Sequence, residues 1–354
     1  IFTLDKIHKA YNQCLKNKKN TANALKFEMQ KEKNLYKLVK ELKERKYKIS
    51  RHICFIVTEP SPREIFASDF RDRVVHHLLC NEIESVFEKE FINNSYANRK
   101  NKGTHKAVKQ LKRYVVRGGV DGNKLYYLKL DIKGFFRNID KQLLFHIIVD
   151  KITSLDADEQ WKSEVLWLTQ MIIKHDPCSN YYFKSKKWMR SLVPIEKSLL
   201  SGEGKRGLPI GNLTSQFFAN IYLNQMDHFI YEDLGFERYI RYVDDFIILD
   251  ESKEKLISAE NRVRDFIEDS LVLKLCDDKT QLRLVEGGVD FLGYYVKPSH
   301  TLVRNKVVKR FKKKIYQSRD SLDGLLDLDK IPMIQSYKGH CKHAYSYNLL
   351  KKLL

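Results

Sequence analysis

A pair of adjacent aspartates inside an apolar, strand-forming stretch is the feature that most constrains this chain. Residues 238–250 read RYIRYVDDFIILD, and Asp244 and Asp245 separate two short runs of mostly β-branched and aromatic residues. Such runs on either side of a two-residue break are typical of a β-hairpin. An ionised carboxylate in apolar surroundings needs a partner. Because an Asp-Asp turn in water would meet that need, the pair alone leaves its role open.

A second carboxylate on a second strand decides between these readings. Residues 125–132, LYYLKLDI, form a strong strand candidate near whose end Asp131 lies. Folding could therefore gather Asp131, Asp244 and Asp245 into a cluster that needs cations to stay fully ionised. Oxygen-only ligands suit Mg²⁺ with its waters and bound phosphates. Two such ions can activate a hydroxyl and stabilise the leaving oxygen of a phosphoryl transfer, which favours a nucleotidyl transferase.

The charge balance indicates the kind of partner. The 354 residues include 65 Lys and Arg against 45 Asp and Glu, a formal net charge of +20. This excess favours a polyanion, nucleic acid first and an anionic membrane second. No segment is long and apolar enough to span a membrane, and none near the start resembles a signal peptide. We expect a cytoplasmic protein that binds nucleic acid and no membrane.

The cysteines and histidines do not predict a metal centre. The six cysteines are scattered and form no CxxC pair, so we expect reduced thiols without a disulfide framework. The run GHCKH at residues 339–343 has no second cluster that could complete a zinc site.

The periodicity of apolar residues predicts an alternation of helices and short strands. The N-terminal part to about residue 48 is helical, and Asp140 is the expected N-cap of a helix. Further helices are predicted at 70–87, 161–173, 215–229, 253–271 and from 303 onward. Strands are predicted at 53–57, in the hairpin, as two short strands within 273–285, and at 289–296. A glycine-rich loop is expected at 202–211, after a polar loop.

Two basic segments are candidates for tracking a phosphate backbone. Residues 95–119 contain no acidic residue, and their cations include Arg99, Lys102 and Lys106. A helix after residue 303 carries a second set: Arg304, Lys306, Lys309, Arg310 and Lys313. Both sets fit contacts to phosphates, although each could also be a solvated basic face.

Three motifs in order give the chain a family resemblance. LDIKGFF follows a strand, GLPIGNLTSQFFANIYLN follows the glycine-rich loop, and YVDD lies on the hairpin. Together they resemble the reverse transcriptases, and more closely those of diversity-generating retroelements, from about residue 53 onward. The resemblance implies an α+β right-hand polymerase with fingers, palm and thumb, an antiparallel palm sheet backed by helices and an α-helical thumb. The expected domains are a helical extension at 1–52, fingers at 53–124, a palm at 125–300 with an insertion at about 174–206, and a thumb at 301–354.

The resemblance also implies roles for the site residues. Asp131 and Asp244 would ligate two Mg²⁺ ions, with Asp245 beside them as the third carboxylate. Lys279, in DDKTQL, would protonate the departing pyrophosphate. Gly293, in FLGYYV, would let the primer backbone approach a primer-grip hairpin.

A further set of residues would select a deoxynucleoside triphosphate. Arg63 would contact the triphosphate, and Phe136 would block a ribose 2′-hydroxyl. Ile132 and Phe135 adjoin them, with Phe135 expected to be the core residue of the Phe-Phe pair. Gly211 and Gln216 complete this expected nucleotide-binding set, together with Ile210.

One departure from the pattern of most reverse transcriptases bears on the fidelity of synthesis. Most members have glutamine before the glycine of the loop that covers the nascent base pair and a Ser-Pro further on. Here Ile210-Gly211 and Ser215-Gln216 stand instead, as in the diversity-generating group. Isoleucine can only pack, which reduces the energy difference between right and wrong pairs. In that group the departure accompanies misincorporation opposite template adenines.

The resemblance implies partners as well. They are a structured template RNA, the cDNA or primer strand, and a basic accessory protein that forms a pentameric barrel. We find no RNase H-like or endonuclease-like segment. Residues 175–197 and the N-terminal helices are the expected docking surfaces.

Three other readings compete with this one. A retron-type or group II intron-type enzyme of ordinary fidelity would usually keep the glutamine and the Ser-Pro. A catalytically silent RNA-binding or abortive-infection protein would not need intact carboxylates and Arg63. A metal-dependent nuclease would not need the nucleotide-selecting residue Phe136.

Overall fold

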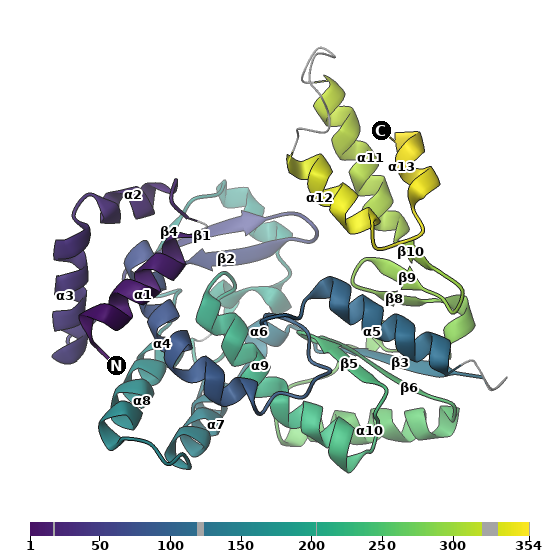
Figure 1. Ribbon diagram of the computed structural model, residues 1–354, viewed down its shortest axis with the longest axis horizontal. Helices are drawn as coiled ribbons and strands as arrows, with labels where there is room; N and C mark the ends of the chain where they lie inside the picture. The colour runs from purple at the N-terminus through teal and green to yellow at the C-terminus, as the bar shows by residue number, and fades with distance from the viewer. Residues whose placement is uncertain (17, 119–123, 203, 321–331, 354) are drawn as a thin grey trace. The chain divides into compact units, whose positions relative to one another are not determined.

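The chain folds into two compact units that are interleaved in sequence. The computed structural model describes residues 1–16, 18–118, 124–202, 204–320 and 332–353 (Figure 1). The first unit comprises Ile1–Ile92, Ile132–His228 and Arg264–Leu275, and the second comprises Asn93–Asp131, Phe229–Val263 and Cys276–Leu354. Gly119, the end of the predicted basic segment, lies outside the described residues. Within them, no helix has the length and apolar character needed to cross a bilayer.

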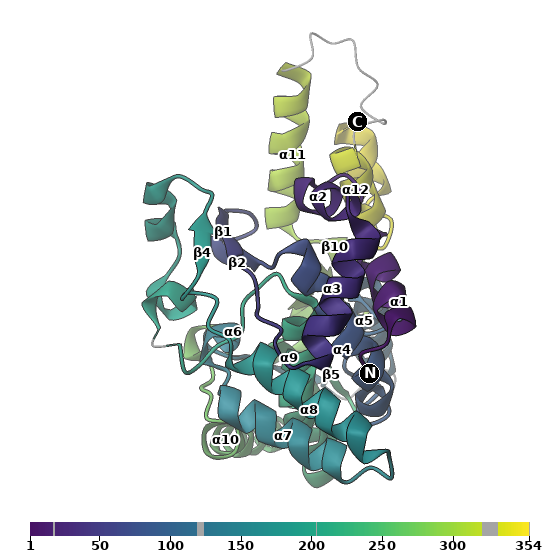
Figure 2. The same cartoon turned by 90° about the vertical axis from the view of Figure 1, so that its left-hand side faces the viewer.

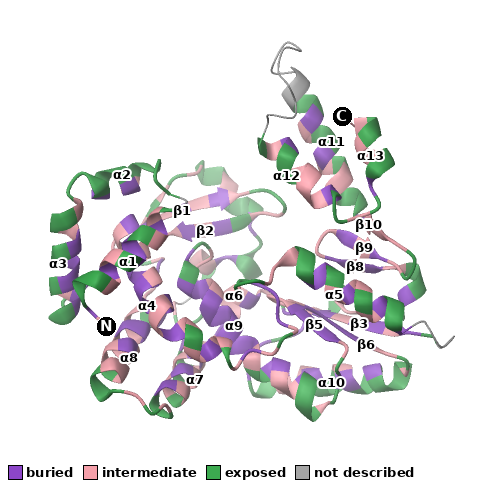
Figure 3. Ribbon diagram, viewed as in Figure 1, coloured by how far each residue is buried: buried purple, intermediate pink, exposed green. Residues whose placement is uncertain are grey.

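Helices build most of the first unit. They are α1 (Leu4–Leu15), α2 (Ala22–Glu28), α3 (Lys31–Lys43), α4 (Phe70–Glu88), α6 (Phe135–Asn138), α7 (Lys141–Thr153), α8 (Glu159–Lys174) and α9 (Leu213–His228). Helix α4 contacts α1, α2, α8 and α9, and its apolar stripe is buried among them (Figure 3). The predicted N-cap is confirmed, since the side chain of Asp140 accepts hydrogen bonds from the amides of Gln142 and Leu143.

The sheet of the first unit has the order β2-β1-β4. Strands β1 (His52–Val57) and β2 (Arg63–Ala67) pair in antiparallel fashion, and β4 (Tyr181–Phe183) joins β1 in parallel, as Figure 2 shows. The expectation that the segment before residue 202, which includes residues 175–197, is a polar loop was therefore incomplete. Besides β4 the segment holds the short 3₁₀ helices Lys187–Leu192 and Ile195–Lys197. The aromatic residues of β4 form a strand because the free edge of β1 provides backbone hydrogen-bond partners, a condition that the local sequence does not reveal.

The central sheet of the second unit is wholly antiparallel, with the order β5-β6-β3-β7. Its strands are β5 (Tyr239–Tyr242), β6 (Asp245–Asp250), β3 (Tyr126–Asp131) and β7 (Gln281–Leu284). Figure 1 shows α5 (Thr104–Arg117) on one side of this sheet and α10 (Lys253–Asp269) on the other. Apolar residues of α5 share a buried core with Tyr127, Ile247 and Leu249. The fold class predicted from the sequence is confirmed.

A smaller sheet and three helices follow in the second unit. The sheet contains β8 (Val289–Phe291), β9 (Tyr294–Val296) and β10 (Thr301–Val303), in the order β10-β9-β8. The helices are α11 (Asn305–Asp320), α12 (Pro332–Cys341) and α13 (Tyr347–Leu353). Phe311, Ile315 and Ile334 form the buried core of α11 and α12.

In this region the prediction of a single strand at 289–296 was wrong, whereas the hairpin that the family resemblance implies is present, and the prediction of two strands within 273–285 was also wrong. Residues 289–296 form a hairpin rather than one strand, because Leu292 and Gly293 both have positive φ angles, 50° and 89°, which suit a two-residue hairpin turn. Within 273–285 only β7 is a strand. The segment before it contains one isolated bridge, Ile132 to Leu275, and the 3₁₀ turn Asp277–Lys279, whose charged residues have no strand partner among the described pairings.

Candidate active site

The two strands that carry the predicted carboxylates are neighbours. Strands β3 and β6 pair so that Asp131 lies directly opposite Asp245, at the last position of the ladder. Because side chains alternate along a strand, both carboxylates lie on the sheet face that bears Tyr127 and Ile247. The prediction that Asp245 lies in the turn was wrong in this detail, since it is the first residue of β6.

Asp244 lies in the turn between β5 and β6, and the backbone before it has an uncommon conformation. Val243 has φ of 59°, a left-handed value that β-branched residues rarely adopt. The buried side chain of Arg241 donates from Nη1 to the carbonyl of Val243 at 3.0 Å and from Nη2 to Ser95 Oγ at 3.0 Å. Arg241 therefore stabilises the strained turn by connecting the carbonyl of Val243 to Ser95.

Two lysines contact the carboxylates. Nζ of Lys129 lies 3.3 Å from Oδ2 of Asp245, and Nζ of Lys279 donates to Oδ1 of Asp131 at 2.6 Å. Lys129 is mostly buried, whereas the Lys279 side chain is 49% exposed. The predicted Lys279 thus contacts one carboxylate of the pair, and Lys129 contacts the other.

The surroundings make Asp245 a weak acid. Burial raises the pKa of its carboxyl to about 7, Lys129 lowers that pKa, and the charges of Asp131 and Asp244 raise it. Oδ1 of Asp245 is buried without a hydrogen-bond partner. Burial lowers the pKa of Lys279, but its hydrogen bond to Asp131 and that carboxylate's charge outweigh burial, so the pKa is raised.

The carboxylates fit Mg²⁺ only when other ligands complete the coordination. Among the described residues, no group of three or more His, Cys, Asp or Glu side chains could hold a metal ion alone. Mg²⁺ in phosphate chemistry is usually bound by one or two carboxylates, with waters and substrate phosphates as further ligands. Asp131 and Asp245 supply oxygen ligands of this kind, and the orphaned Oδ1 of Asp245 is an unsatisfied acceptor that a cation would satisfy.

The first unit brings several predicted nucleotide-selecting residues together. The amide of Leu208 donates to the carbonyl of Phe136 at 2.7 Å, and the amide of Phe66 donates to the carbonyl of Ile210 at 2.9 Å. Gly211 has φ of 120°, and a Cβ there would lie 2.9 Å from a methyl carbon of Ile65. The glycine-rich loop is therefore fixed to both α6 and β2.

A family model described as reverse transcriptase (RNA-dependent DNA polymerase) matches residues 58–296 of this sequence. The chain belongs to the reverse transcriptase family. The prediction of an RNA-directed DNA polymerase is thereby confirmed at the level of the family.

Curated relatives are similar at low identity. Protein YkfC of Escherichia coli K12 is 23% identical over 268 residues, 67% of this chain and 62% of that protein. The group II intron-encoded protein LtrA of Lactococcus lactis is 22% identical over 346 residues, 79% of this chain and 52% of that protein. The reverse transcriptase described here thus spans between half and two thirds of the length of these relatives.

Solved structures show the same fold. The telomerase of Candida albicans, solved with a fragment of telomeric RNA, matches with a TM-score of 0.51 at 13% identity and covers 78% of this chain and 52% of its own. The telomerase of Candida tropicalis matches with a TM-score of 0.52 at 14% identity, covering 72% and 55%. At these identities the likeness concerns the fold alone.

The other predicted nucleotide contacts differ in accessibility. Arg63 is exposed at the first position of β2, and Phe136 and Gln216 are half-buried. Ile132 and Phe135 are only 1% and 2% exposed, so their side chains belong to the core of the reverse transcriptase. Only their backbone atoms could contact a nucleotide.

Three cations of the first basic segment donate to nearby backbone carbonyls. Arg99 donates to the carbonyl of Ser95, Lys102 to that of Asn93, and Lys106 to that of Asn101. These contacts shape the loop before α5, and the role of the three cations in nucleic-acid binding stays a prediction.

The second basic set lies on and just before α11. Lys306, Lys309 and Lys313 are exposed on this helix and Arg310 is half-buried. Arg304 differs, because its guanidinium pairs with Asp290 at 3.0 Å and its amide donates to the carbonyl of Gly293. It thus also joins the β8–β9 turn to α11.

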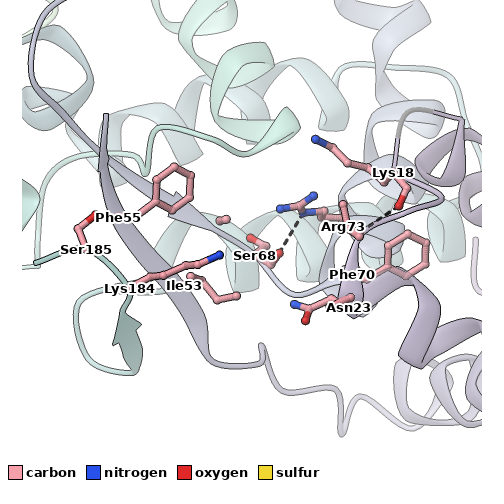
Figure 4. Close-up of a pocket in the computed structure, with 12 residues that line it drawn as sticks. Lys18, Asn23, Ile53, Phe55, Ser68, Phe70, Arg73, Lys184 and Ser185 are labelled. Carbon is pink, nitrogen blue, oxygen red and sulfur yellow. Dashed lines mark hydrogen bonds between the residues drawn. The ribbon is translucent and has the colours of Figure 1, made fainter. Parts of the chain in front are cut away.

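A pocket of about 550 Å³ opens in the first unit against β1 and α4. Figure 4 shows the terminal nitrogens of Lys18, Arg73 and Lys184 directed toward this space. The rings of Phe55 and Phe70 also line it, and none of the described residues around it is acidic. Cations with aromatic surfaces are typical of sites that bind single-stranded nucleic acid.

Sequence reasoning missed three residues around the carboxylates and the β8–β9 hairpin: Lys129 contacts Asp245, Arg241 contacts the turn before Asp244, and Asp290 on β8 contacts Lys129 and Arg304. Lys129 precedes Asp131 by two residues, so strand alternation alone places both on one face. That signal could have identified Lys129. The side-chain partners of Arg241 and Asp290 are remote in sequence or across a turn, and no local pattern predicts them.

Proposed function

We propose that this reverse transcriptase makes error-prone cDNA, mutated at template adenines, from the template RNA of a diversity-generating retroelement. The observation that carries the polymerase part is the opposition of Asp131 and Asp245 at the end of β3 and β6, next to Asp244. The mutagenic part is supported by Ile210, which occupies the position where most reverse transcriptases have glutamine.

The chain's own residues would perform the transfer as follows. Asp131, Asp244 and Asp245 would hold two Mg²⁺ ions, which when bound increase the acidity of the primer 3′-hydroxyl and stabilise the leaving oxygen. Lys279, which donates to Oδ1 of Asp131 at 2.6 Å, would carry the proton needed by the departing pyrophosphate. Arg63 would neutralise the triphosphate.

Nucleotide choice would depend on two side chains. Phe136 is half-buried and would leave no room for a ribose 2′-hydroxyl, so deoxynucleotides are the proposed substrates. Ile210 presents an aliphatic side chain, and its carbonyl is already used by Phe66. A base pair covered by Ile210 receives no oriented side-chain hydrogen bond, which reduces discrimination against wrong pairs.

The nucleic-acid partners would be the template RNA and the cDNA or primer strand. The pocket of Lys18, Arg73 and Lys184 suits an unpaired template strand, and the exposed lysines of α11 suit duplex phosphates. A basic pentameric accessory protein is part of the proposal through the family resemblance. Cytoplasmic location is likewise proposed.

A second candidate is a group II intron-type reverse transcriptase of ordinary fidelity. The similarity to LtrA over 346 residues favours it. A silent RNA-binding protein is less favoured, because the carboxylates, Lys279 and Arg63 are all present.

The test is cDNA synthesis with Mg²⁺ on the element's own RNA, with the accessory protein added, followed by sequencing of the products. We expect substitutions concentrated at template adenines and no product from Asp244→Asn. Faithful cDNA would move the enzyme to the intron-type candidate. Tight RNA binding without any cDNA from the wild type would overturn the polymerase assignment.

A further inference from the structure

Lys129 contacts two different parts of the second unit. Its Nζ lies 3.3 Å from Oδ2 of Asp245 on β6 and donates at 2.8 Å to the carbonyl of Asp290 on β8. The side chain is only 15% exposed, so the ammonium group is held by these contacts more than by water. Buried polar groups need such partners, which means that Lys129 cannot easily leave either one.

The contacts continue from Asp290 to the start of α11. Oδ2 of Asp290 pairs with Nη2 of Arg304 at 3.0 Å, and the amide of Arg304 donates to the carbonyl of Gly293 at 2.8 Å. Two ion pairs, joined through the hydrogen bond from Lys129 to the Asp290 carbonyl, thus connect Asp245, the β8–β9 hairpin and Arg304 just before α11. Each contact is short and lies within one unit. Removing the Lys129 side chain should therefore alter the position of the β8–β9 hairpin.

We propose that Lys129 is a positioning residue that fixes the Asp245 carboxylate relative to the β8–β9 hairpin. The proposal rests on the proposed function, in which Asp245 belongs to the metal site, and on the primer-grip role that the family resemblance implies for the hairpin with Gly293. Transfer needs the primer hydroxyl and the carboxylates in one geometry, and an error near 1 Å can cost about 100-fold in rate.

The chemistry of lysine suits this role. A single ammonium on a flexible stem can donate to a carboxylate and a carbonyl that lie in different directions. Its charge also compensates Asp245 while no metal is bound. The same charge must oppose a divalent cation at that carboxylate, so removing it should favour Mg²⁺ binding while it harms geometry.

The experiment compares Lys129→Met, Lys129→Arg and wild type in single-turnover primer extension. For Lys129→Met we expect a rate about 10- to 100-fold lower, a KM for deoxynucleotide within about twofold of wild type, and a half-saturating Mg²⁺ concentration about two- to fivefold lower. The deoxynucleotide KM should hold because none of the described contacts of Lys129 involves Phe136 or Ile210. Lys129→Arg keeps the charge and should recover part of the rate. Lys255→Met, on the exposed side of α10, is the matched control and should match wild type.

Three results would overturn the proposal: full activity of Lys129→Met, a raised Mg²⁺ requirement, or a rate loss that disappears when the variant is assayed below its lowered unfolding temperature. A second readout does not need activity. Hydrogen exchange of residues 289–296 should become faster in Lys129→Met and stay unchanged in Lys255→Met. Should the wild type make no cDNA, the proposed function fails, and unchanged exchange in Lys129→Met would overturn this inference separately.

Discussion

Asp131 and Asp245 are directly opposed at the end of the ladder between β3 and β6, and Lys129, two residues before Asp131, contacts Asp245. Like charges at opposed positions destabilise a sheet, whereas the neighbouring pairs Leu130–Phe246 and Leu128–Ile248 stabilise it through buried contacts. The repulsion between the two opposed carboxylates is offset in part by Lys129 and Lys279. Such local conflicts in an otherwise consistent fold are typical of functional sites.

Asp131→Asn should separate the catalytic role of this pair from its effect on stability. We expect primer extension to fall by at least about 1000-fold, because one metal-binding oxygen pair loses its charge. In EDTA the free energy of unfolding should change by less than about 1 kcal/mol, because the removed repulsion and the weakened contact with half-exposed Lys279 offset each other. Urea unfolding and extension assays measure both. Asp278→Asn, which changes an exposed residue close by, should alter neither; activity within tenfold of wild type in Asp131→Asn would contradict the assignment.

Arg241→Lys should weaken the turn that presents Asp244. Lysine keeps the charge but cannot donate to both Val243 O and Ser95 Oγ in the same geometry. Left with a buried acceptor unsatisfied, the protein should lose about 1–3 kcal/mol of unfolding free energy. The maximal extension rate should also fall, by about tenfold, from misplacement of Asp244. An unchanged rate at a temperature where the variant is fully folded would show that the turn does not depend on Arg241.

The pH dependence of stability should come partly from two buried histidines of the first unit. Burial lowers the pKa of His52 to about 4 and that of His76 to about 3, and His76 Nδ1 lies 3.2 Å from Thr214 Oγ1. The unfolded chain, with a histidine pKa of about 6.5, binds more protons than the folded chain below that pH. Stability is therefore fully present above about pH 6.5 and is lost as the pH falls toward 4, on the order of 2 kcal/mol for each histidine.

Urea unfolding between pH 4.5 and 7.5 measures this slope. His76→Gln should show a shallower pH dependence than wild type, although its stability at pH 7.5 is lower. The exposed His146→Gln variant is the control and should keep the wild-type slope. Equal slopes in His76→Gln and wild type would refute the contribution of His76.

Phe136→Val should admit ribonucleotides. The smaller side chain leaves space where the 2′-hydroxyl would lie, and Phe135 stays in the core to maintain α6. We expect the preference for deoxynucleotide over ribonucleotide, as a ratio of kcat/KM, to fall by about 10- to 100-fold. Single-nucleotide extension with each substrate measures it. An unchanged preference for deoxynucleotides would show that Phe136 packs as an ordinary half-buried ring and does not select the sugar.

Ile210→Gln should make synthesis more faithful. A glutamine amide could give the nascent pair one oriented hydrogen bond, worth about 0.5–1.5 kcal/mol, so substitutions at template adenines should fall by about two- to tenfold. Sequencing of cDNA made by both enzymes tests this. Ile210→Val changes size without adding a polar group and should keep the wild-type error pattern; an equal drop in both variants would point to packing instead.

The sequence by itself determined those features that depend on neighbouring residues. The two strands around Asp244, the strand that ends at Asp131 and the N-cap Asp140 follow from alternation and from local hydrogen bonds. The motif order was enough to identify the family. Because side chains alternate along a strand, the sequence also places Lys129 on the same sheet face as Asp131.

The tertiary structure determined which residues distant in sequence contact one another. Asp131 and Asp245 are 114 positions apart, as 245 − 131 gives, and only the register of β3 with β6 makes them opposed. The pairing of β4 with β1, the partners of Arg241 and the contact of Lys129 with Asp290 likewise arise from long-range packing. A local pattern fixes backbone conformation over a few residues. Which edges and charges come together depends on the free energy of the whole fold, which no short window of sequence contains.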